Sequence, residues 1–302
     1  MPKVQHIEVT SAEDGQKLFQ FLDRRLQGEI PRSALMRWIR TGQVRIDRSR
    51  SKPFTKVHSG QLVRVPPYSR DNLESAPVSA SGKENPFLLR TVYEDFQVLV
   101  LAKPSNLPSQ PGKKQKDSVS ERIKHMYANS DWVPALVHRL DKDTSGLLLL
   151  AKTYNYLQYL QNIWSGEKVR KIYLAWVNAD TNWSQWSRIK DVIYQKRDSE
   201  QYRVTAISSI LTLERRKGMS LLAVGLHTGR KHQIRIQLQK RGLAIIGDQK
   251  YNAVASGQGL LLHAWHLSWD NYSFTLPPPW IDHYRVSPEI ATSVAGILDT
   301  GT

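Results

Sequence analysis

The sequence predicts an α+β protein: a mixed, mostly antiparallel sheet with flanking helices, preceded by a small α/β domain at the N-terminus. Three observations lead to this fold class. Runs with strand-like alternation and runs with helical spacing follow one another without a regular β-α-β repeat. The 302 residues, 40% of them hydrophobic, suffice for one large domain with a small companion. The charge is uneven, because half of the net +16 falls within the first 70 residues.

The N-terminal block, residues 14–68, has its own pattern of two helices and two strands. One helical face is formed by four apolar residues at helical spacing: Leu18, Phe21, Leu22 and Leu26. A second helix is expected between Ser33, as its cap, and Gly42, at its end. Two short strands are predicted over Gln43–Asp47 and Gln61–Pro66. This block is therefore expected to fold as a separate basic module.

Residues 69–86 are polar and turn-rich and predict a linker, followed by a larger domain over 87–286 and a tail over 287–302. Strands of the larger domain are expected at Leu88–Tyr93, Gln97–Ala102, Ile172–Val177 and Ser220–Leu226. Helices are expected after Asp117, with Val119, Ile123 and Met126 on one face, and after a capping Thr153, with Leu157, Leu160 and Trp164.

Composition narrows the class of protein. A net charge of +16 and a pI near 9.9 favour a polyanionic partner, most commonly nucleic acid. The chain has no cysteine, which excludes disulfides, thiol catalysis and thiolate metal sites. No apolar run reaches the roughly 18 residues of a membrane-spanning helix, and no signal-peptide core follows Met1. We expect a cytoplasmic monomer that binds nucleic acid and not a membrane.

The most informative stretch is a charged turn between two apolar runs, Ala135–Val137 and Leu147–Ala151. From residue 138 to residue 152 it reads His-Arg-Leu-Asp-Lys-Asp-Thr-Ser-Gly-Leu-Leu-Leu-Leu-Ala-Lys. The pattern predicts a strand–loop–strand passage that lifts the carboxylate of Asp141 out of a buried sheet. Most charged turns are only solvated connections, and the length of this motif sets it apart.

This stretch resembles the signature loop of the RluA family of RNA pseudouridine synthases. The resemblance implies the pseudouridine synthase fold and the isomerisation of uridine to pseudouridine in RNA. It makes Asp141 the catalytic nucleophile. It also implies that Arg139 enters the RNA where the target base was stacked, which offsets a flipping cost of a few kcal/mol. Without the resemblance, Arg139 indicates only a phosphate contact.

Two downstream segments add candidate site residues. The run His227-Thr-Gly-Arg-Lys-His-Gln-Ile-Arg235 resembles the family motif TGRxHQIR, which implies an ion pair between Arg235 and Asp141. Gly242 favours a short helix there. The run Arg170-Lys-Ile-Tyr-Leu-Ala175 resembles KxYxA, which implies that Tyr173 stacks on the target uracil. Without the resemblance, a tyrosine in a strand more often packs in a core. Arg235 would then be a surface contact to phosphate as readily as a partner of Asp141.

Weaker matches extend the resemblance over most of residues 87–280. They are Lys103-Pro-Ser-Asn-Leu-Pro-Ser-Gln-Pro-Gly112, Gly247-Asp-Gln-Lys-Tyr-Asn252 and Leu260–Leu267. Asn106 and Gln110 replace the family's usual glycine and histidine, so no catalytic role is carried over to them. The segment at 260–267 predicts a core strand with a hydrogen-bonded histidine.

The N-terminal block resembles an S4-type RNA-binding domain in the segments Leu22–Leu26, Ser33–Arg45 and Ser59–Val65. Gly60-Gln61 stands where that family usually has Gly-Asp. The expected RNA-binding residues are Arg24, Arg25, Arg32, Arg37, Arg40 and Arg45 of this block and Arg139 and Arg230 of the larger domain. The alternative is a basic module that is merely well solvated.

No metal and no cofactor are expected. His227, His232, His263 and His266 offer four ring nitrogens, but no cysteine or nearby carboxylate completes a typical set. Converting uridine to pseudouridine breaks one glycosidic bond and forms another, and needs neither a redox partner nor phosphate energy.

The sequence therefore predicts a cofactor-independent pseudouridine synthase acting on structured RNA. It looks most like members that modify large-subunit ribosomal RNA. A tRNA pseudouridine synthase and a non-catalytic RNA-binding or ribosome-assembly protein on the same scaffold are the alternatives. A hydrolase using Asp141 with His138 is a weaker one, because no nucleophilic serine motif accompanies this pair.

Overall fold

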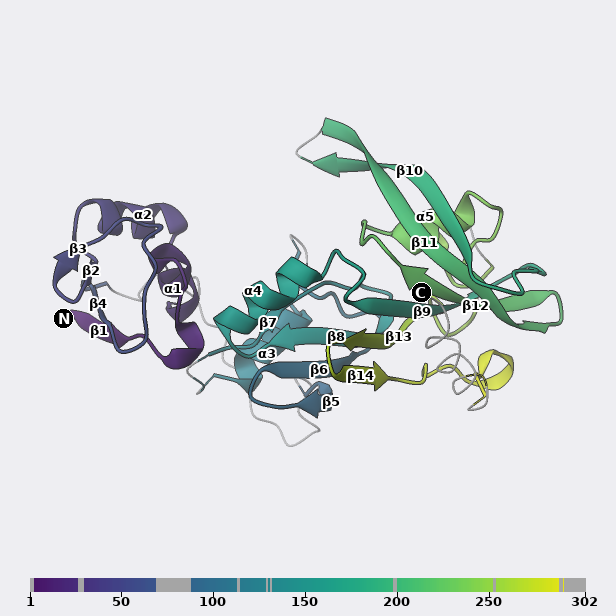
Figure 1. The fold of residues 1–302 in the computed structure, drawn as a ribbon, viewed down its shortest axis with the longest axis horizontal. Coiled ribbons are helices and arrows are strands. Elements are labelled where there is room, and N and C mark those ends of the chain that lie inside the picture. The colour runs from purple at the N-terminus through teal and green to yellow at the C-terminus, as the bar shows by residue number, and fades with distance from the viewer. Residues whose placement is uncertain are drawn as a thin grey trace.

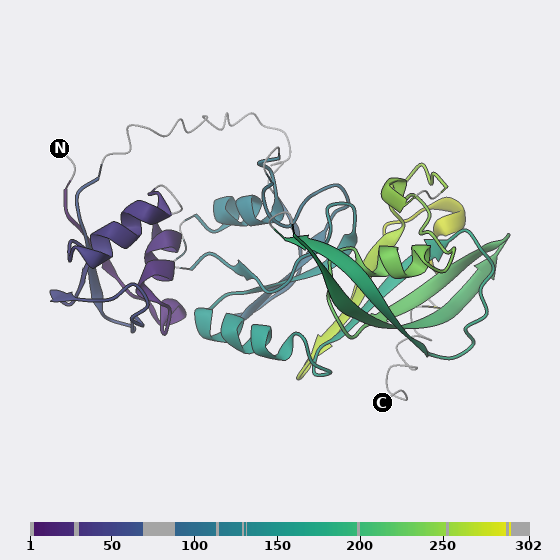
Figure 2. The same ribbon diagram turned by 90° about the horizontal axis from the view of Figure 1, so that it is seen from above.

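A computed structural model describes residues 3–26, 30–68, 88–112, 115–128, 130, 132–197, 200–251, 254–287 and 290. The predicted linker at 69–86 and all of the predicted tail except residues 287 and 290 lie outside this part. The described chain forms two sheets, each with its own helices, and the purple N-terminal unit lies beside the larger domain (Figures 1 and 2). None of the described helices is long and apolar enough to cross a membrane.

The N-terminal unit is a four-stranded antiparallel sheet in the order β1-β4-β2-β3, with two helices. Its elements are β1 (Gln5–Glu8), α1 (Leu18–Arg25), α2 (Arg32–Arg40), β2 (Arg45–Ile46), β3 (Ser49–Arg50) and β4 (Leu62–Val65), with a 3-10 turn at Ser11–Glu13. Strand β1 was not predicted, because Ile7 is its only apolar residue and is half-buried. The unit thus begins before the expected boundary at residue 14.

Both predicted helices of this unit are confirmed. Helix α1 buries Leu18, Phe21 and Leu22 in a core shared with α2 and β4. The predicted cap of α2 was wrong: Ser33 lies inside the helix, and Pro31 occupies the N-cap position. The fixed φ of proline suits a helix start, and its missing N–H is no loss there. Gly42, with φ +74°, follows the end of α2 as expected.

The larger domain is built on a ten-stranded sheet, which confirms the predicted α+β class. Eight strands lie in the order β10-β11-β12-β9-β13-β8-β6-β5, with β14 beside β13 and β7 beside β8. The strands are β5 (Arg90–Glu94), β6 (Val98–Lys103), β7 (Ala135–Leu136), β8 (Ser145–Ala151), β9 (Arg170–Val177), β10 (Ser187–Arg197), β11 (Glu200–Arg216), β12 (Met219–Leu226), β13 (Leu262–Trp269) and β14 (Tyr272–Thr275). The helices are α3 (Val119–Met126), α4 (Tyr154–Ile163) and α5 (Gln233–Gln239), and Gln249–Tyr251 and Asp282–Tyr284 form 3-10 turns. Thr153 caps α4 as predicted, because its hydroxyl accepts the amide of Tyr156 at 3.2 Å.

The two halves of this sheet meet where β13 pairs with β8. This is the single parallel pairing in the described part, and it spans only two residue pairs, His263 with Ser145 and Ala264 with Gly146. Gly146 has φ +119°, and a Cβ there would lie 2.3 Å from the carbonyl oxygen of Ala264. His263 lies 2.8 Å from the Ser145 hydroxyl through Nδ1 and 2.9 Å from the Leu276 carbonyl through Nε2. The prediction of a core strand with a hydrogen-bonded histidine is confirmed.

The hairpin β10–β11 was not predicted. Its strands pair over eleven residues, and Figure 1 shows its tip reaching well beyond the rest of the sheet. Charged and polar residues occupy both faces of its outer part, so the alternation that marks a half-buried strand is weak there. Helix α5 packs against these two strands and against β12, with Ile234 and Leu238 buried.

One arginine links the N-terminal unit to the larger domain. The guanidinium of Arg24, on α1, lies 3.8 Å from the ring centroid of Trp132 and donates to the carbonyl of Val133 at 2.7 Å. Burial lowers the pKa of Arg24 to about 10, opposed by the nearby carboxylate of Glu13. These two contacts fasten α1 to the segment that leads into β7.

Candidate active site

The predicted strand–loop–strand passage is confirmed: β7 and β8 flank the loop that carries Asp141. His138 at its start faces away from Asp141. Its ring stacks on Trp164 at 4.4 Å, and its Nε2 accepts the amide of Leu149 at 3.1 Å. Burial lowers the pKa of His138 to about 3, with the charge of Lys171 as a smaller cause. His138 is therefore a neutral structural residue, and this geometry does not support a hydrolase built on His138 with Asp141.

A second loop, residues 103–109, holds the backbone on both sides of Asp141. Ser109 bonds both backbone groups of Leu140: its hydroxyl donates to the carbonyl at 2.8 Å and accepts the amide at 3.0 Å. The hydroxyl of Ser105 donates to the carbonyl of Asp143 at 2.7 Å. Backbone groups on either side of Asp141 are thus fixed by side chains.

The buried ammonium of Lys103 completes this hold. Its Nζ donates to the carbonyls of Pro104, Leu107 and Lys142 at 2.8, 2.7 and 3.0 Å. Burial lowers the pKa of Lys103 to about 7, and nearby carboxylates, that of Asp141 among them, oppose the shift. One side chain therefore joins the two loops.

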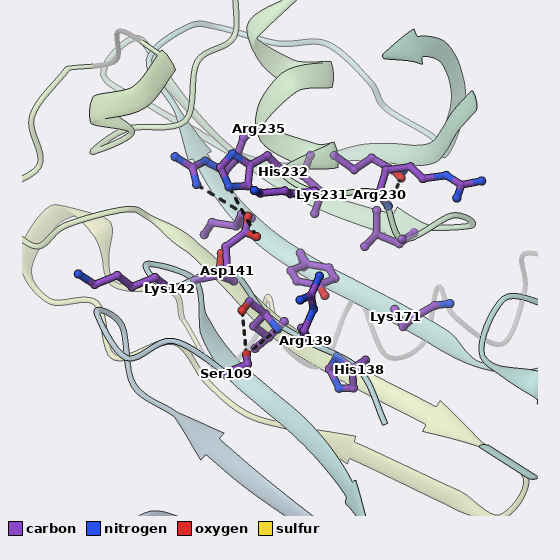
Figure 3. A pocket seen from close by; sticks show the side chains of 18 of the residues that line it. Ser109, His138, Arg139, Asp141, Lys142, Lys171, Arg230, Lys231, His232 and Arg235 are labelled. Atoms are coloured by element: carbon purple, nitrogen blue, oxygen red, sulfur yellow. Dashed lines mark hydrogen bonds and ion pairs between the residues drawn. The ribbon is translucent and has the colours of Figure 1, made fainter. Parts of the chain in front are cut away.

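A guanidinium and an imidazole face the two carboxylate oxygens of Asp141 (Figure 3). Nη1 of Arg235, on α5, lies 3.7 Å from Oδ2, and Nε2 of His232 lies 3.8 Å from Oδ1. The side chain of Asp141 is 26% exposed and that of Arg235 only 5%. The structure thus brings the predicted pair, Asp141 and Arg235, within ion-pair distance and adds His232.

The shortest contacts of Arg235 go to another residue. Its Nε and Nη2 donate to the two carboxylate oxygens of Asp248, each at 2.7 Å, and Asp248 is buried. The guanidinium therefore lies between two carboxylates, gripped by Asp248 and facing Asp141. The sequence had offered no role for Asp248.

The third predicted catalytic residue, Tyr173, lies on β9 and lines the same cavity. Burial raises the pKa of its hydroxyl, and the charge of Asp141 adds to the shift. The phenol is therefore neutral at physiological pH. Lys171, two residues before it, also lines the cavity, and burial lowers its pKa to about 8.

These side chains border an open cavity of about 880 Å³. That volume falls within the range of about 300–1,000 Å³ typical of ligand sites, and leaves room for a nucleotide. Two exposed arginines, Arg139 and Arg230, come from different edges of the cavity (Figure 3). Nη1 of Arg139 lies 3.5 Å from Oε1 of Gln110, and Arg230 donates to the Thr205 carbonyl at 3.2 Å. A ring of cations around one carboxylate suits a polyanion that presents a neutral base to that carboxylate.

The arginines predicted to bind RNA in the N-terminal unit fall into two groups. Those with exposed side chains are Arg32, Arg37, Arg40 and Arg45. Arg24 and Arg25 are instead engaged inside the protein: Arg24 stacks on Trp132, and Arg25 forms an ion pair with Glu13 at 2.6 Å. None of the N-terminal arginines lines the cavity.

The site residues that sequence reasoning missed are Lys103, Ser109, His232 and Asp248. Each lies in a segment that the family resemblance covers, but contacts between residues 13 to 91 positions apart cannot be derived from a motif. Within the described part of the chain, no group of three or more histidines and carboxylates is arranged to hold a metal ion.

Comparison with known proteins places this chain in one class, the pseudouridine synthases. Residues 97–240 match the family model described as RNA pseudouridylate synthase. The ribosomal large subunit pseudouridine synthase C of Pasteurella multocida is 32% identical over 257 residues, covering 82% of this chain and 78% of the relative. Its namesake from Escherichia coli strain K12 is 32% identical over 263 residues, covering 83% and 80%.

Solved structures agree on the fold. Human RNA pseudouridylate synthase domain containing 1 superposes with a TM-score of 0.55 at 18% identity, covering 72% of this chain and 98% of that one. Human RNA pseudouridylate synthase domain containing 4 gives 0.52 at 20% identity, covering 69% and 93%. The chain belongs to the RNA pseudouridylate synthase family.

Proposed function

We propose that the protein isomerises uridines to pseudouridines in large-subunit ribosomal RNA, with Asp141 as the group that attacks the substrate. The observation that carries the proposal is one partly exposed carboxylate in a cation-lined cavity, faced by Arg235 and His232. A non-catalytic RNA-binding protein has no use for an anion at the place where phosphates would gather.

The reaction rearranges bonds within one nucleotide. The N1–C1′ bond breaks, a C5–C1′ bond forms, and the proton displaced from C5 is balanced by one gained at N1. Asp141 supplies the nucleophile or base, whether it attacks C1′, C6 or a 2′ proton. Tyr173 offers a neutral aromatic face to the base, and Arg139 lies at the rim, where a base would be withdrawn from its stack.

The assignment of the target rests on the relatives. Those quoted above are named as acting on the ribosomal large subunit, and they share about a third of their residues with most of this chain. The basic N-terminal unit fits a large structured RNA. We infer that it is an S4-type module that binds phosphates through its exposed arginines: Arg32, Arg37, Arg40 and Arg45. Arg139 and Arg230 would bind phosphates beside the cavity. A cytoplasmic monomer without metal or cofactor completes the proposal.

The decisive experiment compares the wild-type protein with Asp141→Asn on transcribed large-subunit rRNA and on a tRNA pool, with pseudouridine mapped at nucleotide resolution. We expect modification of specific rRNA uridines by the wild type and none by the variant, with RNA affinity unchanged. Modification by Asp141→Asn would refute the role of this carboxylate. Modification of tRNA alone would reassign the target, and modification of neither RNA would leave a binding protein.

A further inference from the structure

We propose that Asp248 and Tyr251, both from the turn after α5, are positioning residues for the reaction: they hold Arg235 and His232 against the two oxygens of Asp141. The inference deepens the proposed function and rests on Asp141 being the reacting group. Neither residue lines the cavity, so each would act through the side chain that it holds.

The turn that carries both residues packs closely against a second backbone segment. Gly247 has φ +81°, and a Cβ there would lie 1.8 Å from the carbonyl oxygen of Gly259. The turn is also tied to the sheet, because the amide of Ile246 donates to the carbonyl of Trp176 on β9 at 2.8 Å. Side chains on this turn therefore have a fixed place relative to the strand that carries Tyr173.

Asp248 decides which edge of the Arg235 guanidinium is available. It occupies the Nε and Nη2 edge with two hydrogen bonds of 2.7 Å, and both residues are buried, so that Nη1 is the guanidinium nitrogen that faces Asp141. A free guanidinium prefers to take a carboxylate in two parallel bonds at about 2.7–2.9 Å. Asp248 takes such a paired edge, and the Nη1 atom that faces Asp141 lies 3.7 Å from Oδ2, beyond hydrogen-bond distance. The oxygens of Asp141 therefore stay free for the substrate, with the cation still near.

Tyr251 performs the same task for His232. Its hydroxyl lies 3.1 Å from Nδ1 of His232, and the Nε2 of that ring lies 3.8 Å from Oδ1 of Asp141. The hydroxyl of Tyr251 thus gives the ring of His232 a partner on the side opposite Asp141. The ring of Tyr251 also lies 5.2 Å from the guanidinium of Arg235. One side chain thus contacts both groups that face Asp141.

The competing explanation is that Asp248 only fastens helix α5 to the domain. The chain offers a matched control for this: Asp191, on β10, also anchors the helix through a carboxylate. It accepts Gln237 at 2.8 Å and Arg241 at 2.9 Å, and it contacts neither Arg235 nor Asp141. Loss of Asp191 should weaken the anchoring of α5 without changing the geometry at Asp141.

The test measures kcat and KM for pseudouridine formation on the RNA that the wild type modifies, with thermal unfolding of each variant. Asp248→Asn cannot accept both bonds of Arg235, and we expect kcat to fall at least about tenfold while KM stays within about threefold. Asp191→Asn should keep the wild-type kcat. Tyr251→Phe retains the ring and loses the hydroxyl, and should lower kcat by a smaller factor at unchanged KM.

A wild-type kcat for Asp248→Asn, an equal loss in Asp191→Asn, or a loss confined to KM would overturn the proposal. If Asp248→Asn does not fold, Tyr251→Phe decides, and an unchanged kcat in that variant refutes the positioning role. The Asp141→Asn variant distinguishes failure of the proposed function from failure of this inference. Activity in Asp141→Asn overturns the proposed function itself, whereas an inactive Asp141→Asn beside a fully active Asp248→Asn overturns only this inference.

Discussion

Ser109 bonds both backbone groups of Leu140, the residue immediately before Asp141: its hydroxyl donates to the carbonyl at 2.8 Å and accepts the amide at 3.0 Å. Both residues are buried. The position of the proposed catalytic carboxylate therefore depends on a serine 32 positions earlier in the chain, through a contact that fixes backbone and not side chain.

We expect Ser109→Ala to lose about 1–3 kcal/mol of unfolding free energy, because a buried amide and a buried carbonyl lose their partner. It should also lower kcat, because the loop that carries Asp141 is released. Ser105→Ala is the matched comparison, because it removes a single hydrogen bond, to Asp143, that is more exposed to solvent. It should lower the unfolding free energy and kcat by less than Ser109→Ala does. Denaturant unfolding and single-turnover kinetics measure the two effects, and equal losses in both variants would contradict the special role of Ser109.

Gly146→Ala should prevent stable folding or destabilise the protein by about 4 kcal/mol or more, because the new methyl group would overlap the backbone of Ala264. Gly242→Ala separates this clash from simple backbone strain. Gly242 also has a positive φ, +72°, but has open space around it, so only about 1–2 kcal/mol should be lost. Thermal unfolding of the two variants provides the comparison, and similar melting temperatures would count against the close approach of β8 to β13.

Acid should weaken the fold through its buried neutral histidines. Burial lowers the pKa of His263 to about 4, opposed by its bond to the Leu276 carbonyl. Between about pH 6.5 and 4 the unfolded chain binds a proton at this residue and the folded one does not, so stability falls as the pH is lowered through this window. The expected loss is on the order of 1–3 kcal/mol for this residue. His138 and His266, with pKa values of about 3 and 4, act in the same direction.

His263→Gln checks the assignment. Relative to its own stability at pH 7.5, this variant should lose less unfolding free energy on going to pH 4.5 than the wild type does, because one of the histidines with a lowered pKa is gone. Urea unfolding at both pH values gives the comparison, and parallel losses in the two proteins would show that the acid sensitivity comes from elsewhere.

Arg24→Ala should loosen the attachment of the N-terminal unit to the larger domain, because it removes the stacking on Trp132 and the bond to the Val133 carbonyl, whereas the contact of the 3-10 turn at Ser11–Glu13 with α4 remains. A cation–π contact and a charged hydrogen bond are each worth about 0.5–3 kcal/mol. We expect a larger radius of gyration by solution scattering and a higher KM for long RNA, with kcat unchanged. Arg25→Ala, which breaks only the pair with Glu13 inside the unit, is the control and should leave the radius of gyration unchanged.

Local signals in the sequence were sufficient for much of the fold. Helices α1, α3 and α4 follow from apolar spacing, and the cap at Thr153 and the glycine after α2 follow from local chemistry. Strands β1, β3, β10, β11 and β14 were missed. β1, β3 and β14 span four residues or fewer, and the outer part of the β10–β11 hairpin carries polar residues on both faces. Alternation is a weak signal in a strand that is very short or that has polar residues on both faces.

The site was predictable only in part, because a motif identifies residues but not the contacts between them. The resemblance named Asp141 and Arg235, and the structure places them 3.7 Å apart. It could not show that Asp248 takes the two best donors of Arg235, since that contact depends on a turn that folds back after the helix. Nor could it show that Arg24 faces Trp132 and not solvent, because a basic residue on a basic helix gives no sign of an internal partner.

The short parallel contact between β8 and β13 has a consequence for how the enzyme fails. Asp141 comes from the half of the sheet that includes β6 and β8, and Arg235 from a helix packed on the other half. The strand pairing between these halves consists of two residue pairs, and core packing supplies the rest of the contact. A chain in which either half has come apart keeps no competent centre, even where its basic surfaces still attract nucleic acid. Damaged or incompletely folded copies would thus still bind RNA but would not modify uridines at the wrong positions.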